Sequence, residues 1–285
     1  MGPPAIAPDI RRVEQARARE NFPVALRVLP ARYRRHLVAL YGYARHVDDL
    51  GDEPVDGGLD RLAALDDVEA GLRGLYAGAD MRHPVLRALA PTVAECGLPL
   101  DTLVRLIEAN RVDQHVTRYA TFEQLVGYCT LSANPVGELV LHVFGQVTPA
   151  AVALSDRICT ALQLVEHLQD VAEDHRRGRV YLPAADLERF GVTEADLARP
   201  SANRQLRELI GFEAERARAW LDAGAPLVSA LHGWGRLAVS GYLAGGRATL
   251  DALAAADHDP LAVTVRPRRR QILGNWLAAT VRGAG

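Results

Sequence analysis

The chain contains no lysine, because all 33 of its basic residues are arginine. An enzyme that forms a Schiff base, a P-loop phosphate binder and a kinase with a catalytic lysine each need that side-chain amine. These three classes are therefore excluded. An anionic ligand would have to be bound by arginine, by a metal ion or by backbone amides.

Cysteine and long apolar runs are also scarce. Cys96, Cys129 and Cys159 lie far apart and lack the spacing of a zinc site or a CxxC motif, so we expect buried, reduced thiols. No run of about 18 uninterrupted apolar residues could span a bilayer, and no apolar block of a secretion signal stands near the first residue. We expect a cytoplasmic protein, either free or bound peripherally to the inner face of the membrane.

What the sequence does contain is typical of a helical globular protein. Hydrophobic residues make up 49% and charged residues 24% of the 285 positions, and strand-like runs of Val, Ile, Thr and Tyr are few. We expect a single all-α domain over residues 1–285, with about 20 N-terminal residues and the tail after about residue 258 peripheral to it. The net charge of −2 argues against nucleic acid as a partner.

Helical periodicity, interrupted by proline and glycine, extends over nearly the whole sequence. Pro135 and Gly137 in "SANPVG" predict a kink within the helical segment from about 121 to 145. The longest clean pattern predicts one helix from about 149 to 176. The other expected helices cover residues 30–50, 59–77, 83–96, 100–116, 200–222, 225–255 with glycine breaks, and 268–281.

Two of these helices carry acidic residues in the same arrangement. One face of the first long helix carries Tyr41, Arg45, Asp48 and Asp52. The same offsets recur in the 149–176 helix, at Gln163, His167, Asp170 and Asp174, with Glu166 and Glu173 beside them. Each helix therefore has an aspartate pair at i and i+4, which charge repulsion destabilises. A bound cation would reverse that effect.

The chemistry of the paired aspartates favours magnesium. A single pair usually marks a solvated helix face, but two pairs with matching offsets in an all-helical chain favour a binding site. Magnesium is usually shared between a few carboxylates and phosphate oxygens. The apolar residues between the acidic ones would line the rest of a cavity. The pattern thus predicts a site for an apolar substrate with a diphosphate head, with His167 and His175 as nearby acid or base candidates.

The segments "YGYARHVDDLGDE", "YCTLSANPVGELVLHVFG" and "LQLVEHLQDVAEDHRRGRVYLP" resemble the head-to-head prenyl synthases, which are squalene, dehydrosqualene and phytoene synthases. The resemblance implies the isoprenoid synthase fold, a helical bundle around a central apolar cavity with two aspartate motifs at its mouth. It also implies about two or three magnesium ions, bound by Asp48, Asp52, Asp170 and Asp174. The positions that match the diphosphate and reaction site of this family are Tyr41, Arg45, Tyr128, Gln163, Arg179 and Tyr181.

Two segments point to one branch of the family. "ENFPVALRVLP" and "SANPVGELVL" are similar to the hydroxysqualene synthases of the bacterial hopanoid route, which convert presqualene diphosphate and water to hydroxysqualene and diphosphate. Such a reaction needs a positioned water, and the candidates to orient it or to stabilise the cation are Tyr128, Asn134 and Tyr242.

The chain also departs from the wider family. Where condensing relatives carry a His- and Ser-rich stretch, it has Ala18, Asn21, Phe22 and Pro23, and it has Glu166 in place of an asparagine. Both departures fall where the family handles diphosphate or metal, so Phe22 and Glu166 are further candidates for substrate binding. They weaken the case for joining two farnesyl groups and are compatible with an enzyme that accepts the preformed intermediate.

Two other functions stay open. One is the condensation of two prenyl diphosphates by a presqualene diphosphate, dehydrosqualene or phytoene synthase, and the other is that of an inactive subunit that binds a prenyl diphosphate.

No GxGxxG follows a predicted strand, so we expect no nicotinamide cofactor. We expect functional coupling to a presqualene diphosphate synthase as the source of substrate. The 225–255 helix or the arginine-rich tail could contact a membrane.

Overall fold

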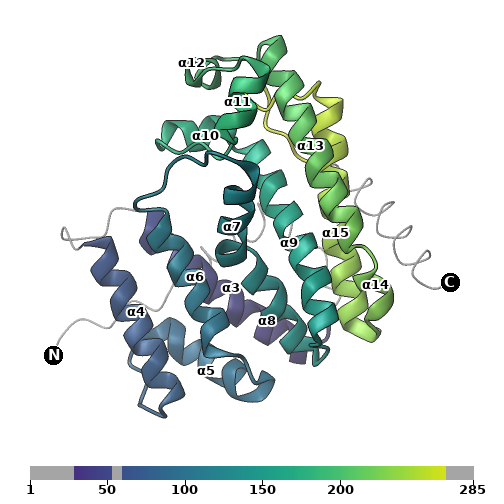
Figure 1. Ribbon diagram of the computed structural model, residues 1–285. Coiled ribbons are helices and arrows are strands. Elements are labelled where there is room, and N and C mark those ends of the chain that lie inside the picture. The colour runs from purple at the N-terminus through teal and green to yellow at the C-terminus, as the bar shows by residue number, and fades with distance from the viewer. Residues whose placement is uncertain (1–28, 53–59, 268–285) are drawn as a thin grey trace.

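The computed structural model describes residues 29–52 and 60–267 (Figure 1). Over these two ranges the chain is helical and has no strand, and the only β-type pairing is an isolated parallel bridge between Arg118 and Val180. The predicted all-α architecture is therefore confirmed. The helices are α3 (Ala31–Asp52), α4 (Arg61–Tyr76), α5 (Pro84–Cys96), α6 (Leu100–Val112), α7 (Phe122–Ser132), α8 (Asn134–Phe144), α9 (Pro149–Gln169), α10 (Val171–Arg176), α11 (Ala184–Phe190), α12 (Glu194–Leu197), α13 (Arg204–Gly224), α14 (Leu227–Ala230) and α15 (Gly233–Ala255).

Local sequence signals set many of the helix ends. The side chain of Thr148 accepts a hydrogen bond from an amide in the first turn of α9, and Asn203 does the same for α13. Gly97 and Gly145 follow α5 and α8 in the left-handed conformation that glycine adopts most readily. These caps place the ends of the long helices close to the positions that the sequence predicts.

The predicted single helix from 149 to 176 is wrong. Helix α9 ends at Gln169, Asp170 has φ −103° and ψ 13°, and α10 begins at Val171. The amide of Asp174 still donates to the Asp170 carbonyl at 2.8 Å, so one residue leaves the helix and the chain then resumes it. A break this short leaves the apolar periodicity on either side intact, and the pattern therefore could not reveal it.

The other helix boundaries follow from proline, glycine and helix length. The interruption expected at "SANPVG" is present, because α7 ends at Ser132 and α8 begins at Asn134. The segment 225–255 is divided into α14 and α15. Helices α11 and α12, of seven and four residues, are too short to give a periodic signal. The predicted helix 268–281 lies outside the described residues.

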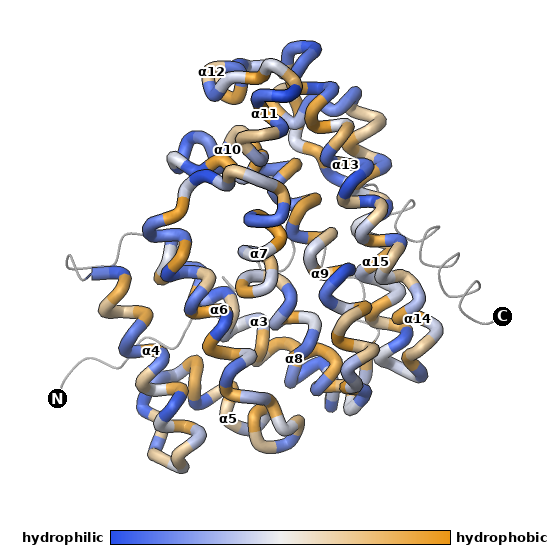
Figure 2. Tube along the Cα trace, viewed as in Figure 1, coloured by the Kyte–Doolittle hydropathy of each residue, from blue (hydrophilic) through white to orange (hydrophobic). Residues whose placement is uncertain are grey.

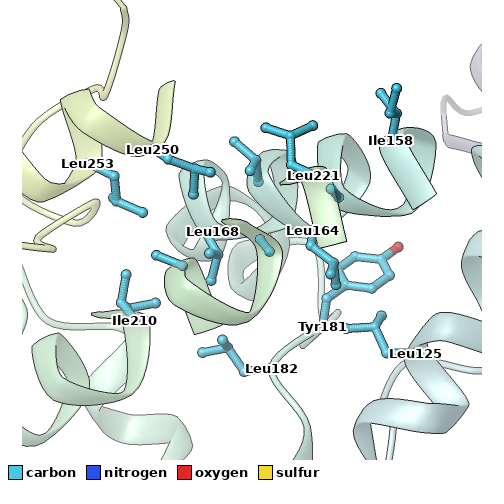
Figure 3. Packing of buried hydrophobic residues seen from close by; sticks show 14 of the residues in the cluster. Leu125, Ile158, Leu164, Leu168, Tyr181, Leu182, Ile210, Leu221, Leu250 and Leu253 are labelled. Atoms are coloured by element: carbon cyan, nitrogen blue, oxygen red, sulfur yellow. The ribbon is translucent and has the colours of Figure 1, made fainter. Parts of the chain in front are cut away.

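Two clusters of buried hydrophobic side chains hold the helices together, as the alternation of hydrophobic and hydrophilic residues along the helices in Figure 2 suggests. The first cluster lies around α9, α13 and α15 (Figure 3) and includes Ile158, Leu168, Ile210, Leu221 and Leu253. The second lies among α3, α4, α5 and α6 and includes Leu37, Tyr43, Leu65, Leu89 and Ile107. Helices α6 and α8 contribute residues to both clusters and so join the two halves.

The segment 178–182, which follows α10, is attached to the segment that follows α6. The amide of Val180 donates to the carbonyl of Thr117 at 2.9 Å, and the guanidinium of Arg118 donates to the carbonyl of Gly178 at 2.6 Å. These contacts hold the chain after the second aspartate motif beside the end of α6.

The described residues include no helix that is both long and apolar enough to cross a membrane. Their exposed large hydrophobic side chains lie on four different segments, at Tyr76, Val116, Val147 and Val263. The arginine-rich tail lies beyond residue 267, outside the described ranges. Peripheral membrane contact therefore stays a prediction.

Candidate active site between the two aspartate motifs

The first aspartate motif occupies the last turns of α3. Asp48 is exposed, yet the surrounding protein removes much of its hydration and raises the pKa of its carboxyl group to about 6, with the charge of Asp52 adding to the effect. The side-chain amide of Asn110 on α6 opposes this shift by donating to Asp48 Oδ1 at 3.1 Å. Asp48 can thus be reached by a ligand but is poorly hydrated, which favours an incoming cation.

Gly51 makes room for Asn110 between the two aspartates. A Cβ atom at position 51 would stand 2.1 Å from Asn110 Oδ1 and 3.0 Å from Asn110 Cγ. No side chain can therefore replace the glycine without moving Asn110. The glycine of "DDLGDE" allows α3 and α6 to approach closely where Asp48 receives its hydrogen bond.

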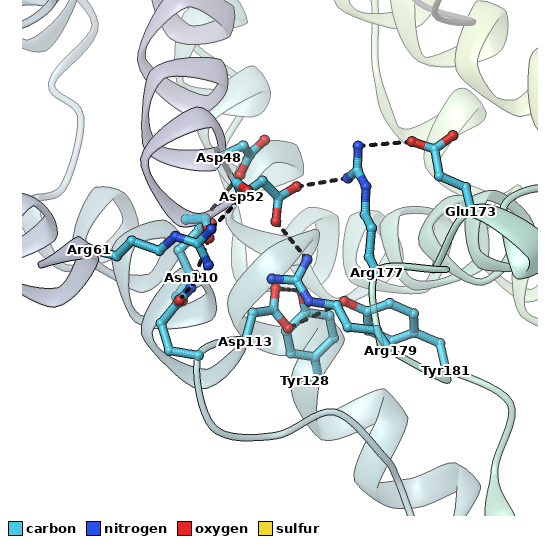
Figure 4. Close-up of polar contacts among 12 residues, drawn as sticks. Asp48, Asp52, Arg61, Asn110, Asp113, Tyr128, Glu173, Arg177, Arg179 and Tyr181 are labelled. Carbon is cyan, nitrogen blue, oxygen red and sulfur yellow. Dashed lines mark hydrogen bonds and ion pairs between the residues drawn. The ribbon is translucent and has the colours of Figure 1, made fainter. Parts of the chain in front are cut away.

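Two arginines that follow the second motif reach back to the first. Arg179 Nη1 lies 2.6 Å from Asp52 Oδ1, and Arg177 Nη1 lies 3.2 Å from Asp52 Oδ2 (Figure 4). Arg177 also pairs with Glu173, at 2.9 Å. The structure therefore brings together two motifs that are more than a hundred residues apart in the sequence.

The second motif spans the break between α9 and α10. Asp170 caps α9 and Asp174 lies on α10. Burial raises the pKa of both carboxyl groups, and burial together with the charge of Asp170 raises that of Asp174 to about 7. In each motif the charge of one aspartate thus disfavours the charge of the other, Asp52 acting on Asp48 and Asp170 on Asp174, and nearby arginines only partly offset this.

Asp113 is a site residue that the sequence reasoning missed. It follows the last residue of α6, and its two carboxylate oxygens accept hydrogen bonds from Tyr128 at 2.6 Å and from Tyr181 at 3.3 Å (Figure 4). The available signal was the pair Asn110 and Asp113, two polar residues three positions apart at the end of a helix whose buried face is mainly apolar.

His167 lies against this group as a neutral ring. Its Nε2 atom is 3.0 Å from Gln163 Nε2, and its ring stacks on that of Tyr181, with the centroids 3.9 Å apart and the planes at 10°. Burial lowers the pKa of His167 to about 3. It therefore stays uncharged at neutral pH and serves to pack against Tyr181.

The remaining predicted residues lie in several places. Arg45 forms an ion pair with Asp49 at 2.8 Å on the exposed side of α3, one turn after Tyr41. Asn134 is buried and accepts a hydrogen bond from Thr160 at 3.0 Å, between α8 and α9.

Three further candidates complete the set. Tyr242, on α15, packs against the second hydrophobic cluster. Glu166 is exposed one turn before Asp170. Phe22 lies outside the described residues, as do the other departures near the start of the chain.

The donor set fits magnesium held jointly with a ligand. Among the described residues, no three Asp, Glu, His or Cys side chains converge closely enough to enclose one ion. Magnesium does not need such a cage, since it is usually bound by one or two carboxylates together with water and phosphate oxygens. Asp48 and Asp52 on one side, and Asp170 and Asp174 on the other, provide carboxylate pairs of this kind.

The helical bundle defines the class of protein, since its architecture is that of the isoprenoid synthase fold. The structure is similar to the crystal structure of squalene synthase HpnC from Alicyclobacillus acidocaldarius, with a TM-score of 0.78 and 42% sequence identity over 87% of this chain and 92% of that one. It also shares its fold with a dehydrosqualene synthase crystallised with a ligand, at a TM-score of 0.83 and 23% identity over 96% of both chains.

Sequence comparison identifies the family. The chain belongs to the squalene/phytoene synthase family, whose sequence profile matches residues 15–273. It is 34% identical to a hydroxysqualene synthase of Zymomonas mobilis over 259 residues, which cover 90% of this chain and 85% of the relative. It is also 32% identical to a phytoene synthase of Mycobacterium tuberculosis, over 74% of this chain and 70% of that protein. The protein is thus a member of the head-to-head prenyl synthases.

Proposed function

We propose that this protein is a hydroxysqualene synthase, which converts presqualene diphosphate and water to hydroxysqualene and diphosphate. The observation that carries the proposal is its similarity to the hydroxysqualene synthase of Zymomonas mobilis over 90% of the chain. Glu166 supports it as well, because an exposed carboxylate one turn before Asp170 adds negative charge beside the second motif. Additional negative charge disfavours a site that must hold two diphosphates at once.

In this proposal the diphosphate binds between the two aspartate motifs. Arg179 and Arg177 supply positive charge there, and a guanidinium can bind a phosphate group with two parallel hydrogen bonds. Arg45 adds a further positive charge on the α3 side. We also propose that Asp48, Asp52, Asp170 and Asp174 hold about two or three magnesium ions with the substrate. Magnesium, when bound, neutralises the charge that develops on the leaving diphosphate.

The aromatic residues around Asp113 would then form the apolar part of the reaction site. Tyr128 and Tyr181 lie on α7 and in segment 178–182, and their ring centroids are 5.8 Å apart. Ring faces stabilise a nearby cation without donating a proton to it. Tyr242 and Asn134 are further candidates to orient the water that captures the cation.

A second candidate function is the condensation of two prenyl diphosphates. The 32% identity to the phytoene synthase of Mycobacterium tuberculosis favours it, because that value is close to the identity with the hydroxysqualene synthase. A product assay separates the two. Purified protein and magnesium would be incubated with presqualene diphosphate, and in parallel with farnesyl or geranylgeranyl diphosphate alone.

We expect presqualene diphosphate to be consumed and hydroxysqualene to form, with one oxygen-18 atom per product molecule when the reaction is run in oxygen-18 water. Consumption of farnesyl or geranylgeranyl diphosphate by the protein alone would overturn the proposal in favour of condensation. Binding of a prenyl diphosphate without turnover of any substrate would indicate an inactive partner subunit instead. The proposal also requires a separate presqualene diphosphate synthase, so adding such an enzyme should make farnesyl diphosphate a usable starting material.

A further inference from the structure

Asp113 connects elements that come from three parts of the chain. It stands at the end of α6, while its hydrogen-bond donors Tyr128 and Tyr181 lie on α7 and in segment 178–182. Burial raises the pKa of Asp113, while the hydrogen bond from Tyr128 and the charge of Arg179, which pairs with Asp52, act in the opposite direction and favour its ionised form. A single carboxylate thus connects the two tyrosines with the arginine that joins the aspartate motifs (Figure 4).

The two phenol groups depend on this carboxylate. Tyr128 and Tyr181 are 8% and 9% exposed, and burial raises the pKa of both, so each keeps its proton. A buried hydroxyl group without an acceptor is costly. Both hydroxyl groups donate hydrogen bonds to Asp113, and this sets the direction in which each hydroxyl group points.

The rings of this group also contact one another. Tyr119, Tyr128 and Tyr181 form three ring pairs with centroids between 5.5 and 5.8 Å apart, and His167 stacks on Tyr181. Because the rings are packed together, a shift of one ring displaces the others. An acceptor that fixes two of the three phenols therefore fixes the whole group.

We propose that Asp113 is a positioning residue of the reaction site, which accepts hydrogen bonds from the hydroxyl groups of Tyr128 and Tyr181 and so fixes both rings relative to the Arg179–Asp52 pair. The two tyrosines then act through the position of their rings, and neither is the acid or base that exchanges a proton with the substrate. The inference rests on the proposed function, because it takes a prenyl diphosphate to be the substrate that binds beside these rings.

The test compares Asp113→Asn, Tyr128→Phe and the double variant with the full-length protein. Phenylalanine keeps the ring and loses only the hydroxyl group, while asparagine keeps the size of the side chain but loses its charge and one acceptor oxygen. We expect each single change to lower kcat about tenfold, with KM changed less than about twofold, because a hydrogen bond to a charged group is lost. The double variant should be no more than about threefold worse than either single variant, because both changes break the same contact.

The products give a second readout. Misplaced rings should let the cation be captured or lose a proton earlier, so Asp113→Asn and Tyr128→Phe should both raise the share of side products. Asp113→Glu, which keeps the charge and both acceptor oxygens, should restore part of the lost kcat and of the product ratio.

Asp259→Asn is the matched control. The Asp259 side chain is also a buried carboxylate, and it accepts from Ser201, Arg207 and the amides of Ala202 and Ala262, away from the aspartate motifs. It should lower Tm without changing kcat or the product ratio. The inference is overturned if Asp113→Asn behaves like this control, or if the double variant loses about a hundredfold because the two effects multiply.

The outcome is separable from that of the proposed function. If the unmodified protein joins two prenyl diphosphates, the proposed function fails, and the same variants are compared on that reaction. If it turns over no substrate, the double-variant comparison is made on Tm and on the near-ultraviolet circular dichroism of the tyrosines. Additive changes in those two quantities would then overturn the role of Asp113.

Discussion

Replacing Gly51 by alanine should destabilise the protein, whereas the same replacement at Gly42, on the same helix, should stabilise it. Alanine is favoured over glycine inside a helix by about 0.5–1 kcal/mol. A Cβ atom at position 42 would meet nothing within 4 Å, but one at position 51 would stand 2.1 Å from Asn110 Oδ1 and 3.2 Å from Asn110 Cβ. The Asn110 side chain must therefore move away in Gly51→Ala.

The cost can be worked out from the contacts of Asn110. Its side-chain nitrogen donates to Asp48 Oδ1 and to the carbonyl of Leu106, both at 3.1 Å. A hydrogen bond to a charged group contributes about 1.5–3 kcal/mol and one to a neutral carbonyl about 1 kcal/mol. After the helix gain is subtracted, Gly51→Ala should lower the free energy of unfolding by about 1.5–3.5 kcal/mol. Gly42→Ala should raise it by about 0.5–1 kcal/mol.

Urea denaturation followed by circular dichroism measures both changes, and Tm should move in the same directions, by about 2–4 °C per kcal/mol. The background variant Asn110→Ala removes the Oδ1 and Cγ atoms and leaves only the Cβ contact at 3.2 Å, so in that background Gly51→Ala should destabilise much less. The reasoning is refuted if the two glycine variants shift stability in the same direction, or if the Asn110→Ala background leaves the effect of Gly51→Ala unchanged.

Three other predictions follow from the site and from one buried carboxylate. Asp48→Ala and Asp170→Ala should each lower kcat at least about a hundredfold; steady-state kinetics with magnesium would contradict this if turnover were kept. Asp170→Ala should leave Tm equal or higher, because desolvation disfavours its charge, whereas Asp48→Ala removes the acceptor of the Asn110 amide and should lower Tm. Arg179→Ala should raise the KM for the prenyl diphosphate about tenfold, and an unchanged KM would count against a diphosphate site between the motifs. Burial beside Asp186 raises the pKa of Glu213 to about 8 from an ordinary 4.5, so the folded protein keeps a proton that the unfolded chain releases. Stability from this group is complete below about pH 4.5 and is lost as the pH rises towards 8, and Glu213→Gln should flatten the fall in Tm over that window, whereas an identical fall in both proteins would contradict the assignment.

The helical fold was readable from the sequence because most long helices bury one stripe of leucine, alanine and valine. The first motif was readable for the same reason, since Asp48 and Asp52 follow the periodicity of α3. The helix ends expected at about residues 145 and 149 also lie close to those of the structure, where Gly145 follows α8 and Thr148 precedes α9. In each of these cases the information lies within a few neighbouring residues.

The features that sequence reasoning missed depend on distant contacts. Asp113 is one acidic residue at the end of a helix, and only the fold brings Tyr128 and Tyr181 to its two oxygens. The pairing of Asp52 with Arg177 and Arg179 likewise joins residues more than a hundred positions apart. The break at Asp170 changes the dihedral angles of a single residue. The pattern of polar and apolar residues around it stays the same, so the sequence could not reveal it.

The attachment of segment 178–182 to the chain after α6 affects the free energy with which an anion can bind. Arg179 lies between Gly178 and Val180, whose backbone groups are already engaged by Arg118 and Thr117. Fixing one residue of a mobile loop costs about 1–2 kcal/mol in conformational entropy, so ordering a free five-residue loop on binding would offset much of the attraction between guanidinium and phosphate. Here the entropy of ordering segment 178–182 is already lost when the protein folds. The attraction of Arg179 for an anion can therefore contribute fully to the binding affinity.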